Sequence, residues 1–474
     1  MRKLLLTTAL CALLAANAAQ AQAQVRADAQ STPVQAPNSR YAAKGWADRI
    51  VLFPGADAAR EMAVAWRTDT RQTTSEAQIA LDISGPSLAL GARTVSGETL
   101  ASTTDNGAAH HHHVRFTGLT PGARYVYRVR AADGWSEWLA FTTAKAEAAP
   151  FRFLYFGDTQ NDILEIGSRV IRQGFLSSGP VDLAVHAGDQ IAQRETKAAD
   201  DEYGEWAEAG GYAFAMIPQA VAAGNHEYRD VIAADGSENR ELGPGWRPHH
   251  ALPANGAAGA EATSYFFDYQ GARFVVLDGT SALDMGTLEA QTTWLDQTLA
   301  ASKARWNIVL MHQPIYTCAR PQDTEPLKSV WKPVFERHNV DLVLQGHDHC
   351  YARVSNEAGA AASRAASAAG QPVGPVYLVS VTGSKMYGLN DRAGAQPVRV
   401  AEDTELYQVL DVEADRIAFR AFTATGALYD GFTLTRGTDN RNRLTETEET
   451  LLATRRCEGA AGPDNRPCTA RGKD

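Results

Sequence analysis

The sequence predicts two domains, an all-β sandwich followed by a larger α/β domain. The chain has 474 residues, which is longer than one hydrophobic core ordinarily organises, so two or three domains are expected. From about residue 46 to residue 145, short stretches alternate apolar with polar residues between turn signals, a pattern typical of strands. From residue 151 onwards, apolar strands alternate with amphipathic segments, which is typical of a layered α/β domain.

The composition describes a globular protein rather than a disordered one, because 44% of the residues are hydrophobic and 21% are charged. The formal net charge of −10 argues against a nucleic-acid-binding surface, since contacts to a phosphate backbone depend on Lys and Arg. A small phosphate compound is not excluded, because a bound metal ion can reverse the local electrostatic field.

Residues 1–23 have the pattern of a secretory signal peptide of the Gram-negative type. Arg2 and Lys3 provide the positive start, and the apolar run LLLTTALCALLAA leads to small residues that place cleavage after Ala21 or Ala23. This run is shorter than the roughly 20 residues that a membrane span needs, and we expect no span elsewhere in the chain. We therefore predict a leader at residues 24–45 and a mature protein that is periplasmic or secreted.

Four cysteines remain after this cleavage, and an oxidising compartment favours disulfide bonds between them. Four cysteines allow three pairings. Cys457 and Cys468 flank a loop of Gly, Pro and Asn residues and are expected to pair, which leaves Cys318 with Cys350. Buried free thiols are the alternative interpretation.

The N-terminal domain is expected to contain strands at residues 49–53, 62–68, 75–81, 113–119, 124–131 and 138–144. Strands this short, with aromatic residues inside and turns between, predict a small β-sandwich at residues 46–145. Four consecutive histidines at 110–113 lead into one of these strands. Because alternate residues of a strand point to opposite faces, at most two of them face one point, and we expect a structural role.

The second domain is predicted at residues 151–436, after a linker at 145–150. Its apolar strands end abruptly in polar clusters, and segments such as 288–302 and 325–339 have helical amphipathicity. We expect the Ala-rich stretch 357–371 to be a loop insertion and residues 437–474 to form a polar tail.

Candidate metal ligands follow five of these strands. They are Asp158, Asp189, Asn225, His312, His347 and His349, with His226 next to Asn225 and Gln160 close to Asp158. Ligand sites usually form at the carboxyl ends of such strands, and His347 and His349 lie on the same side of an extended chain. Asp, Asn and His together suit a pair of divalent or trivalent ions such as Fe, Mn or Zn, with Asp189 as a bridging carboxylate.

The order GDTQ, GDQ, GNHE, MHQP and GHDH resembles the five-block signature of the calcineurin-like metallophosphoesterase superfamily. The two-domain chain is similar to the purple acid phosphatase branch, in which a fibronectin type III-like domain precedes the catalytic domain; residues 111–129 and 346–353 resemble that branch. The resemblance implies a four-layer metallophosphoesterase β-sandwich flanked by helices. It also implies two ions, one held by Asp158, Asp189 and His349, and the other by Asp189, Asn225, His312 and His347.

Two positions depart from the family pattern. The purple branch has a coloured iron tyrosinate three residues after the bridging Asp, and other branches have an Asp there that pairs with His226; this chain has Ala192. Many members have a metal-binding His at the position of Gln160, whose carbonyl oxygen suits a harder ion such as Mn or Mg. We predict a protein that is not purple and that holds one of its ions weakly.

The resemblance implies attack of a metal-bound hydroxide on a phosphate ester, with Asp189 and His226 as catalytic residues. His226 would neutralise developing charge and protonate the leaving oxygen, and Asn225 would also contact the substrate. Residues 245–250 resemble the substrate-side segment of the purple branch, so Arg247, His249 and His250 are candidate substrate contacts; a solvated loop is the alternative for Arg247 and His250.

The favoured function is that of an exported acid phosphatase-type phosphomonoesterase acting on a small phosphate ester. A phosphodiesterase or nucleotide phosphohydrolase is the first alternative, because the ligand set does not separate these activities. A binding protein that keeps the fold without turnover is the second, and an adaptor role of the N-terminal domain is the third. The sequence leaves the oligomeric state open.

Overall fold

The computed structural model describes residues 40–194, 196–232, 235–236, 238–355, 359–390, 397–457 and 459–468. Residues 43–474 form one compact unit, which contains every element described below, and residues 1–42 belong to another. The predicted signal peptide and most of the leader lie outside the described residues. Within the described part of the chain, no helix is both long enough and apolar enough to cross a membrane.

The N-terminal domain is a β-sandwich, as predicted. One sheet has the order β1 (Asp48–Pro54), β2 (Met62–Thr68), β6 (Gly107–Phe116), β5 (Glu98–Thr104). The other has β4 (Arg93–Ser96), β3 (Glu76–Leu81), β7 (Arg124–Ala131), β8 (Gly134–Trp135), with β9 (Leu139–Thr142) also on β7 and a short helix η1 (Leu88–Gly91) nearby. Trp66, Phe116, Tyr127 and Phe141 pack between the sheets. The prediction missed β4 and β5 because these edge strands are largely exposed and carry little apolar alternation.

The second domain contains an eight-stranded sheet whose parallel part holds the first ligand loops. Its order is β12 (Gln219–Val221), β11 (Leu183–His186), β10 (Phe151–Phe156), β23 (Leu406–Val412), β24 (Arg416–Thr423), β25 (Leu428–Arg436), β26 (Asn442–Glu446), β20 (Pro372–Val373). β10, β11 and β12 run parallel to one another. Their carboxyl ends therefore meet at one edge of the sheet.

A seven-stranded sheet packs against the first one. Its order is β15 (Tyr265–Tyr269), β16 (Ala272–Val276), β17 (Trp306–Leu310), β18 (Leu342–Gln345), β21 (Val376–Val379), β19 (Tyr351–Val354), β22 (Arg399–Ala401). The strands β16, β17, β18 and β21 are parallel. Phe153 and Tyr155 of β10 point into the core between the sheets, whereas Leu154 and Phe156 point to the helices on the outer face. A strand buried on both faces explains the continuous apolar run FRFLYF.

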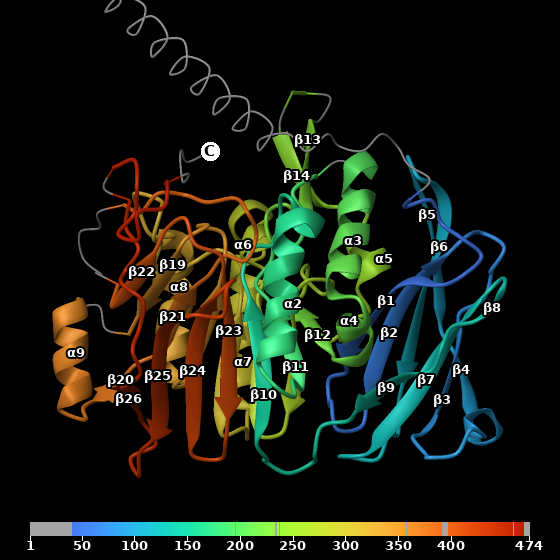
Figure 1. The fold of residues 1–474 in the computed structure, drawn as a ribbon, viewed down its shortest axis with the longest axis horizontal. Helices are drawn as coiled ribbons and strands as arrows, with labels where there is room; N and C mark the ends of the chain where they lie inside the picture. The colour runs from blue at the N-terminus through green and yellow to red at the C-terminus, as the bar shows by residue number, and fades with distance from the viewer. Residues whose placement is uncertain are drawn as a thin grey trace, which may run out of the picture. The chain divides into compact units, whose positions relative to one another are not determined.

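Helices cover the two outer faces and complete four layers (Figure 1). The turn η2 (Ile163–Gly167), α2 (Ser168–Ser177), α3 (Thr196–Gly210) and α4 (Tyr212–Met216) lie on the eight-stranded sheet. Helices α6 (Gly279–Asp284), α7 (Leu288–Ala300) and α8 (Glu325–Arg337) lie on the seven-stranded sheet. The predicted fold class is thereby confirmed.

Two predictions about loops and boundaries need correction. β26 pairs with β25, so the domain continues beyond the predicted boundary at residue 436 into the supposed polar tail. The Ala-rich stretch contains a helix, α9 (Ala360–Ala368). Alanine has the highest helix propensity, and no helix-breaking residue occurs after the start of this helix until Gly370. Between β12 and β15 the chain forms a hairpin of β13 (Tyr228–Ile232) and β14 (Glu238–Leu242) and a short helix α5 (Trp246–His249).

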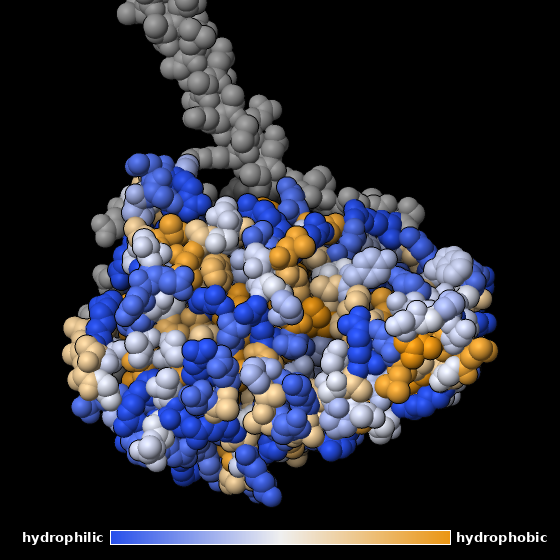
Figure 2. Space-filling view, turned by 60° about the horizontal axis from the view of Figure 1, so that its bottom comes forward, coloured by the Kyte–Doolittle hydropathy of each residue, from blue (hydrophilic) through white to orange (hydrophobic). Residues whose placement is uncertain are grey.

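Both predicted disulfide bonds are present, Cys318–Cys350 and Cys457–Cys468. Hydrophilic residues cover much of the face drawn in Figure 2, and hydrophobic residues there form separate groups. This distribution is ordinary for a folded protein, since apolar atoms contribute more than half of most protein surfaces.

A candidate metal centre between the two sheets

The two sheets bring the predicted ligands together from opposite sides. Asp158, Asp189 and Asn225 follow β10, β11 and β12 of the eight-stranded sheet, whereas His312 and the pair His347 and His349 follow β17 and β18 of the other. All of these strands are parallel within their sheets, so the loops after them emerge at the same end. The site is therefore built by packing one sheet edge against another.

His312 is the centre of one group of ligand atoms. Its Nε2 lies 3.2 Å from Asp189 Oδ2, 3.2 Å from Asn225 Oδ1 and 3.1 Å from His347 Nδ1. The three His and Asp members have ligand atoms within 4.8 Å of one another. This group has the composition implied by the family resemblance for one of the two ions.

Asp158, Asp189 and His349 form a second group, and Asp189 belongs to both. His349 Nε2 lies 3.6 Å from Asp158 Oδ1, and all three side chains are almost fully buried. A carboxylate shared by two groups of ligands is the arrangement expected of a bridging ligand between paired ions.

The backbone at the ligands is held in an uncommon conformation. Asp189, His347 and His349 have φ angles of 47°, 74° and 47°, which non-glycine residues rarely adopt. Such strain persists only where surrounding structure fixes it, and it concentrates at functional sites. Glycines beside the ligands allow the close approach, because a Cβ on Gly346 would lie 2.4 Å from Asp158 Oδ2 and one on Gly224 would lie 2.1 Å from Asp189 Oδ1.

Backbone carbonyls orient two of the histidines. His312 Nδ1 lies 2.8 Å from the carbonyl of Ala187, and His349 Nδ1 lies 2.8 Å from that of Lys385. A carbonyl only accepts, so these Nδ1 atoms carry protons and both Nε2 atoms face the ligand groups. Fixing the tautomer in this way is what metal-binding histidines require.

The electrostatics of the cluster suit cations. Burial raises the pKa of Asp158 to about 7, although His312 opposes this shift. Burial lowers the pKa of His312, but Asp189 and Asp158 outweigh it and raise the value to about 9. Burial lowers the pKa of His349 to about 3, although Asp189 opposes this shift. Buried carboxylates and lone pairs that converge in this way repel one another, and positive ions would relieve that repulsion, so the donor set fits the predicted pair of metals.

Gln160 reaches the cluster with its amide nitrogen rather than its oxygen. Nε2 donates to Asp189 Oδ2 at 3.1 Å and lies 2.8 Å from His349 Nε2, whereas the buried Oε1 has no hydrogen-bond partner among the described residues. Coordination by the carbonyl oxygen therefore requires rotation of the amide group, which exchanges the two atoms.

His226 lies beside the cluster and is the most exposed of its histidines, with 17% of its side chain accessible. Its backbone N–H donates to Asp189 Oδ1 at 2.9 Å, and its Nε2 lies 3.9 Å from Asp189 Oδ2. Nδ1 lies 2.5 Å from the carbonyl of Ala192. Nε2 is thus the ring atom on the side of the ligand groups, where a substrate phosphate would bind.

Sequence reasoning gave no role to Glu227 of the GNHE block. Its buried carboxylate accepts hydrogen bonds from the backbone N–H groups of Asp189, Gln190 and Gly224, at 3.0, 2.9 and 2.6 Å. Burial raises the pKa of Glu227 to about 8, with a further contribution from Asp189. Glu227 therefore ties together two ligand loops, and only its place inside the motif could have indicated this.

Asp348 was also missed, although it lies between the two histidines of the GHDH block. Its buried carboxylate accepts from the backbone N–H of Cys318 and Ala319 and from the guanidinium of Arg320. The disulfide Cys318–Cys350 joins the same two segments. The loop after β17 and the His347–His349 loop are therefore fixed to each other both covalently and by hydrogen bonds.

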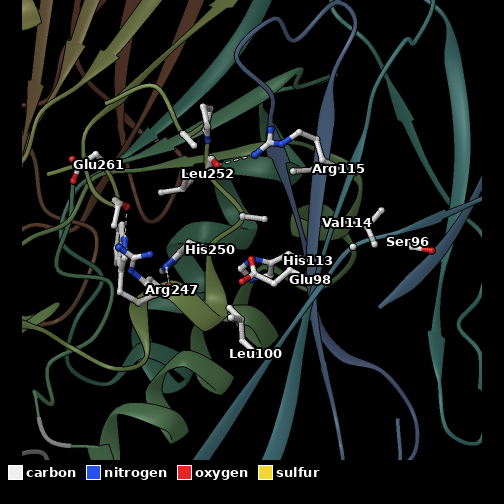
Figure 3. A pocket seen from close by; sticks show the side chains of 17 residues that line it. Ser96, Glu98, Leu100, His113, Val114, Arg115, Arg247, His250, Leu252 and Glu261 are labelled. Carbon is white, nitrogen blue, oxygen red and sulfur yellow. Dashed lines mark hydrogen bonds between the residues drawn. The ribbon is translucent and has the colours of Figure 1, made fainter. Parts of the chain in front are cut away.

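The structure places the candidate substrate contacts of residues 245–250 away from this cluster. His249 stacks on Tyr203 with ring centroids 4.2 Å apart, meets His111 at 4.6 Å, and lies 2.9 Å from Arg49 Nη1. Arg247 and His250 line a cavity of about 450 Å³ between the sandwich and the second domain, opposite His113 and Glu98 (Figure 3). None of the proposed metal ligands lines this cavity. These three residues therefore pack at the domain junction, and we no longer assign them to the substrate.

The four-histidine run belongs to the same junction and to the sandwich. His111 contacts His249, and His113 Nε2 lies 2.9 Å from the carbonyl of Pro248. His112 points to the other side of β6, where it stacks on Trp66 and lies 2.8 Å from Thr68 Oγ1. The alternation expected for a strand is observed, and the contacts are those of packing residues.

Two protein-family models match the chain. The purple acid phosphatase N-terminal domain matches residues 47–143, and the calcineurin-like phosphoesterase matches residues 151–351. An uncharacterized protein of Mycobacterium tuberculosis is 26% identical over 335 residues, which cover 63% of this chain and 60% of that protein. Acid phosphatase type 7 of Homo sapiens is 28% identical over 328 residues, which cover 62% of this chain and 67% of that protein. The chain thus spans about 60% of the length of the mycobacterial relative.

A solved structure shares the fold of both domains. It is that of purple acid phosphatase PPD1 from seeds of yellow lupin (Lupinus luteus), with a TM-score of 0.63, 18% sequence identity, and coverage of 83% of this chain and 75% of that one. At this identity the likeness shows the fold alone. The two family models and the acid phosphatase relatives show that the chain belongs to the calcineurin-like metallophosphoesterase superfamily, in its purple acid phosphatase-like branch.

Proposed function

We propose that this protein is an exported, metal-dependent phosphohydrolase that acts as an acid phosphatase-type phosphomonoesterase on small phosphate esters. The observation that carries the proposal is the shared position of Asp189, whose carboxylate belongs to both groups of candidate ligands. A single structural ion would need one such group, whereas two groups joined by a carboxylate suit a pair of ions about 3.5–4 Å apart.

In this proposal Asp158, Asp189 and His349 hold one ion, and Asp189, Asn225, His312 and His347 hold the other. When bound, divalent or trivalent ions such as Fe, Mn or Zn supply Lewis-acid polarisation of the phosphate ester and activate a water nucleophile. Gln160 contributes its oxygen to the first group only after rotation, which is why we expect this ion to be the more labile one. With Ala192 in place of a tyrosine, we expect no purple colour.

The chain's own residues then perform three tasks. Asn225 turns its oxygen towards His312, which leaves its amide nitrogen to donate to a phosphate oxygen. His226 donates from Nε2 to the oxygen of the departing alcohol, while the proton on Nδ1 stays hydrogen-bonded to the carbonyl of Ala192. Asp189 orients His226 through its backbone N–H. Correct placement of a proton donor contributes about 10²–10⁴-fold to a rate.

The proposal is tested by hydrolysis of p-nitrophenyl phosphate with the purified mature protein, before and after chelation and after addition of Mn²⁺. We expect activity that disappears with the chelator and returns with the ion, and no activity for Asp189→Asn under any condition. Bis(p-nitrophenyl) phosphate, tested in parallel, separates monoester from diester preference. A wild-type protein that binds two ions but hydrolyses neither compound would contradict the proposal and favour a binding function.

Export is supported by the two disulfide bonds, which form in oxidising compartments. We expect the secreted or periplasmic protein to begin after Ala21 or Ala23 and to contain no free thiol. Intact-mass measurement with and without a thiol reagent checks both. Reactive thiols in the native exported protein would contradict this part of the proposal.

A further inference from the structure

His226 donates its second hydrogen bond to the backbone of a loop. The methyl group of Ala192 has no polar atom, and it is the carbonyl oxygen of this residue that lies 2.5 Å from His226 Nδ1. Because a carbonyl accepts and never donates, this contact fixes the proton on Nδ1 and leaves Nε2 facing the ligand groups. The orientation of His226 therefore depends on where the peptide of Ala192 is held.

Glu202 holds that peptide. One oxygen of its carboxylate, Oε2, accepts the backbone N–H of Ala192 at 2.6 Å and that of Gln193 at 2.8 Å. Two adjacent N–H groups bound to one oxygen fix the direction of the chain. The carbonyl of Ala192 points to His226 from the same turn. Glu202 therefore fixes the backbone of Ala192, and this backbone in turn fixes the imidazole of His226.

Helix α3, which carries Glu202, is in turn fixed by the sandwich. Asp200, two residues before Glu202, is buried and forms ion pairs with Arg49 of β1 at 2.6 Å and Arg67 of β2 at 3.2 Å. Asn106 donates to the same carboxylate at 2.8 Å. The start of α3 is thereby attached to the N-terminal domain by charge-assisted bonds, and the helix has little freedom to shift Glu202.

We infer that Glu202 is the positioning residue for His226, replacing through the backbone of Ala192 the side-chain partner that this position lacks. The inference rests on the proposed function, in which His226 protonates the leaving oxygen. In that step a water oxygen bonds to phosphorus and the bond between phosphorus and the leaving oxygen breaks. The leaving oxygen takes the Nε2 proton of the imidazolium form of His226, which becomes a neutral ring. The proton on Nδ1 remains in its hydrogen bond to Ala192.

Leaving groups of different basicity separate this role from a general structural one. An alkyl oxygen, as in glycerol 2-phosphate, departs poorly without a proton, whereas p-nitrophenolate departs without one. Misplacement of His226 therefore slows the alkyl ester much more than the aryl ester. Damage to the metal ligands or to the fold slows both esters alike.

The experiment compares Glu202→Met, which keeps the volume but accepts no hydrogen bond, with Glu202→Gln, whose amide oxygen still accepts both N–H groups. The matched control is Glu208→Gln on the exposed side of the same helix. For Glu202→Met we expect kcat on glycerol 2-phosphate to fall at least about tenfold more than kcat on p-nitrophenyl phosphate, with KM and metal content unchanged. Glu202→Gln should retain most of the wild-type ratio, and Glu208→Gln all of it.

An equal fall on both esters, a loss of metal, or an unchanged ratio in Glu202→Met would overturn the inference while leaving the phosphohydrolase proposal intact. A wild-type protein inactive on every ester would instead remove the proposed function. The geometry can then still be checked by ¹⁵N NMR of His226. At a pH where the ring is neutral, we expect a single tautomer protonated at Nδ1 in the wild type and a mixture in Glu202→Met, and the same tautomer in both would overturn the inference.

Discussion

Buried histidines gather in two regions of this molecule, and their surroundings differ. At the candidate metal centre, ring nitrogens of His312, His347 and His349 face carboxylates and one another. At the domain junction, the rings of His111, His249 and His250 face aromatic rings, backbone carbonyls and Arg49. Both regions lower the pKa of most of their histidines through burial. The partner of the lone pair, rather than burial or residue type, therefore distinguishes a ligand from a packing residue.

The largest difference between the two regions should appear in metal binding. Asp189→Ala removes the carboxylate common to both ligand groups, so we expect loss of both ions and a fall in activity of at least about a hundredfold, since even outer contacts cost 10–100-fold in metal affinity. His249→Ala at the junction should leave the metal content unchanged. Elemental analysis of dialysed protein checks both. Metal loss in His249→Ala would contradict the distinction between the two groups of histidines.

The junction should respond most strongly to a change in its ion pairs. Burial alone would raise the pKa of Asp200, but attraction to Arg49 and Arg67 lowers it to about 2. Asp200→Ala leaves two buried guanidinium groups without this partner, which costs about 3–5 kcal/mol of unfolding free energy. Urea unfolding followed by tryptophan fluorescence measures the effect. Arg71→Ala, at an exposed ion pair, is the control and should change stability by about 1 kcal/mol or less.

Acid should destabilise the junction through its neutral histidines. Burial lowers the pKa of His250 from 6.5 to about 3. Above pH 6.5 the ring is neutral in the folded and the unfolded protein, so its contribution to stability is fully present. As the pH falls below 6.5, the unfolded chain binds a proton at this ring but the folded protein does not, and stability decreases. Between pH 7 and pH 4 this removes about 3 kcal/mol of stability. His250→Phe should reduce the loss by that amount, measured by unfolding at both pH values; an unchanged pH dependence would show that His250 is protonated in the fold.

The smallest effect is expected at Gln160. Gln160→His would place an imidazole beside Asp189 and His349. We expect the more labile ion to bind on the order of tenfold more tightly. The number of ions retained after dialysis measures this, with Gln190→His, which is buried in the next loop, as the control. Equal retention by the wild type and Gln160→His would mean that this site is already complete.

Much of the fold and most of the proposed ligand set could be predicted, because each ligand follows a buried apolar strand and buried strands leave a clear pattern. The strands end next to one another, so residues at their ends lie close together in space. Asp158 and His349 are therefore in contact although 191 positions separate them in the sequence. Their roles as ligands remain predictions.

The features that the sequence did not predict correctly depend on packing between distant parts of the chain. β4 and β5 were missed because exposed edge strands need no apolar pattern. His249 and His250 were assigned to the substrate because a short family segment surrounds them, whereas their contacts come from residues such as Arg49, Tyr203 and Phe53 that are distant in the chain. Glu202 was overlooked because it contacts backbone N–H groups, which no side-chain motif encodes.

The ligands of the candidate centre come from both sheets, and this affects how long the folded protein survives. Ions that bind only the assembled site stabilise it by RT ln(1 + [L]/Kd), so the free metal concentration sets the fraction of molecules in which the sheet edges separate. Separated edges expose chain to proteases. Where metal is scarce, such a chain would be degraded sooner as well as work more slowly, and its abundance would follow the metal supply without any change in its synthesis.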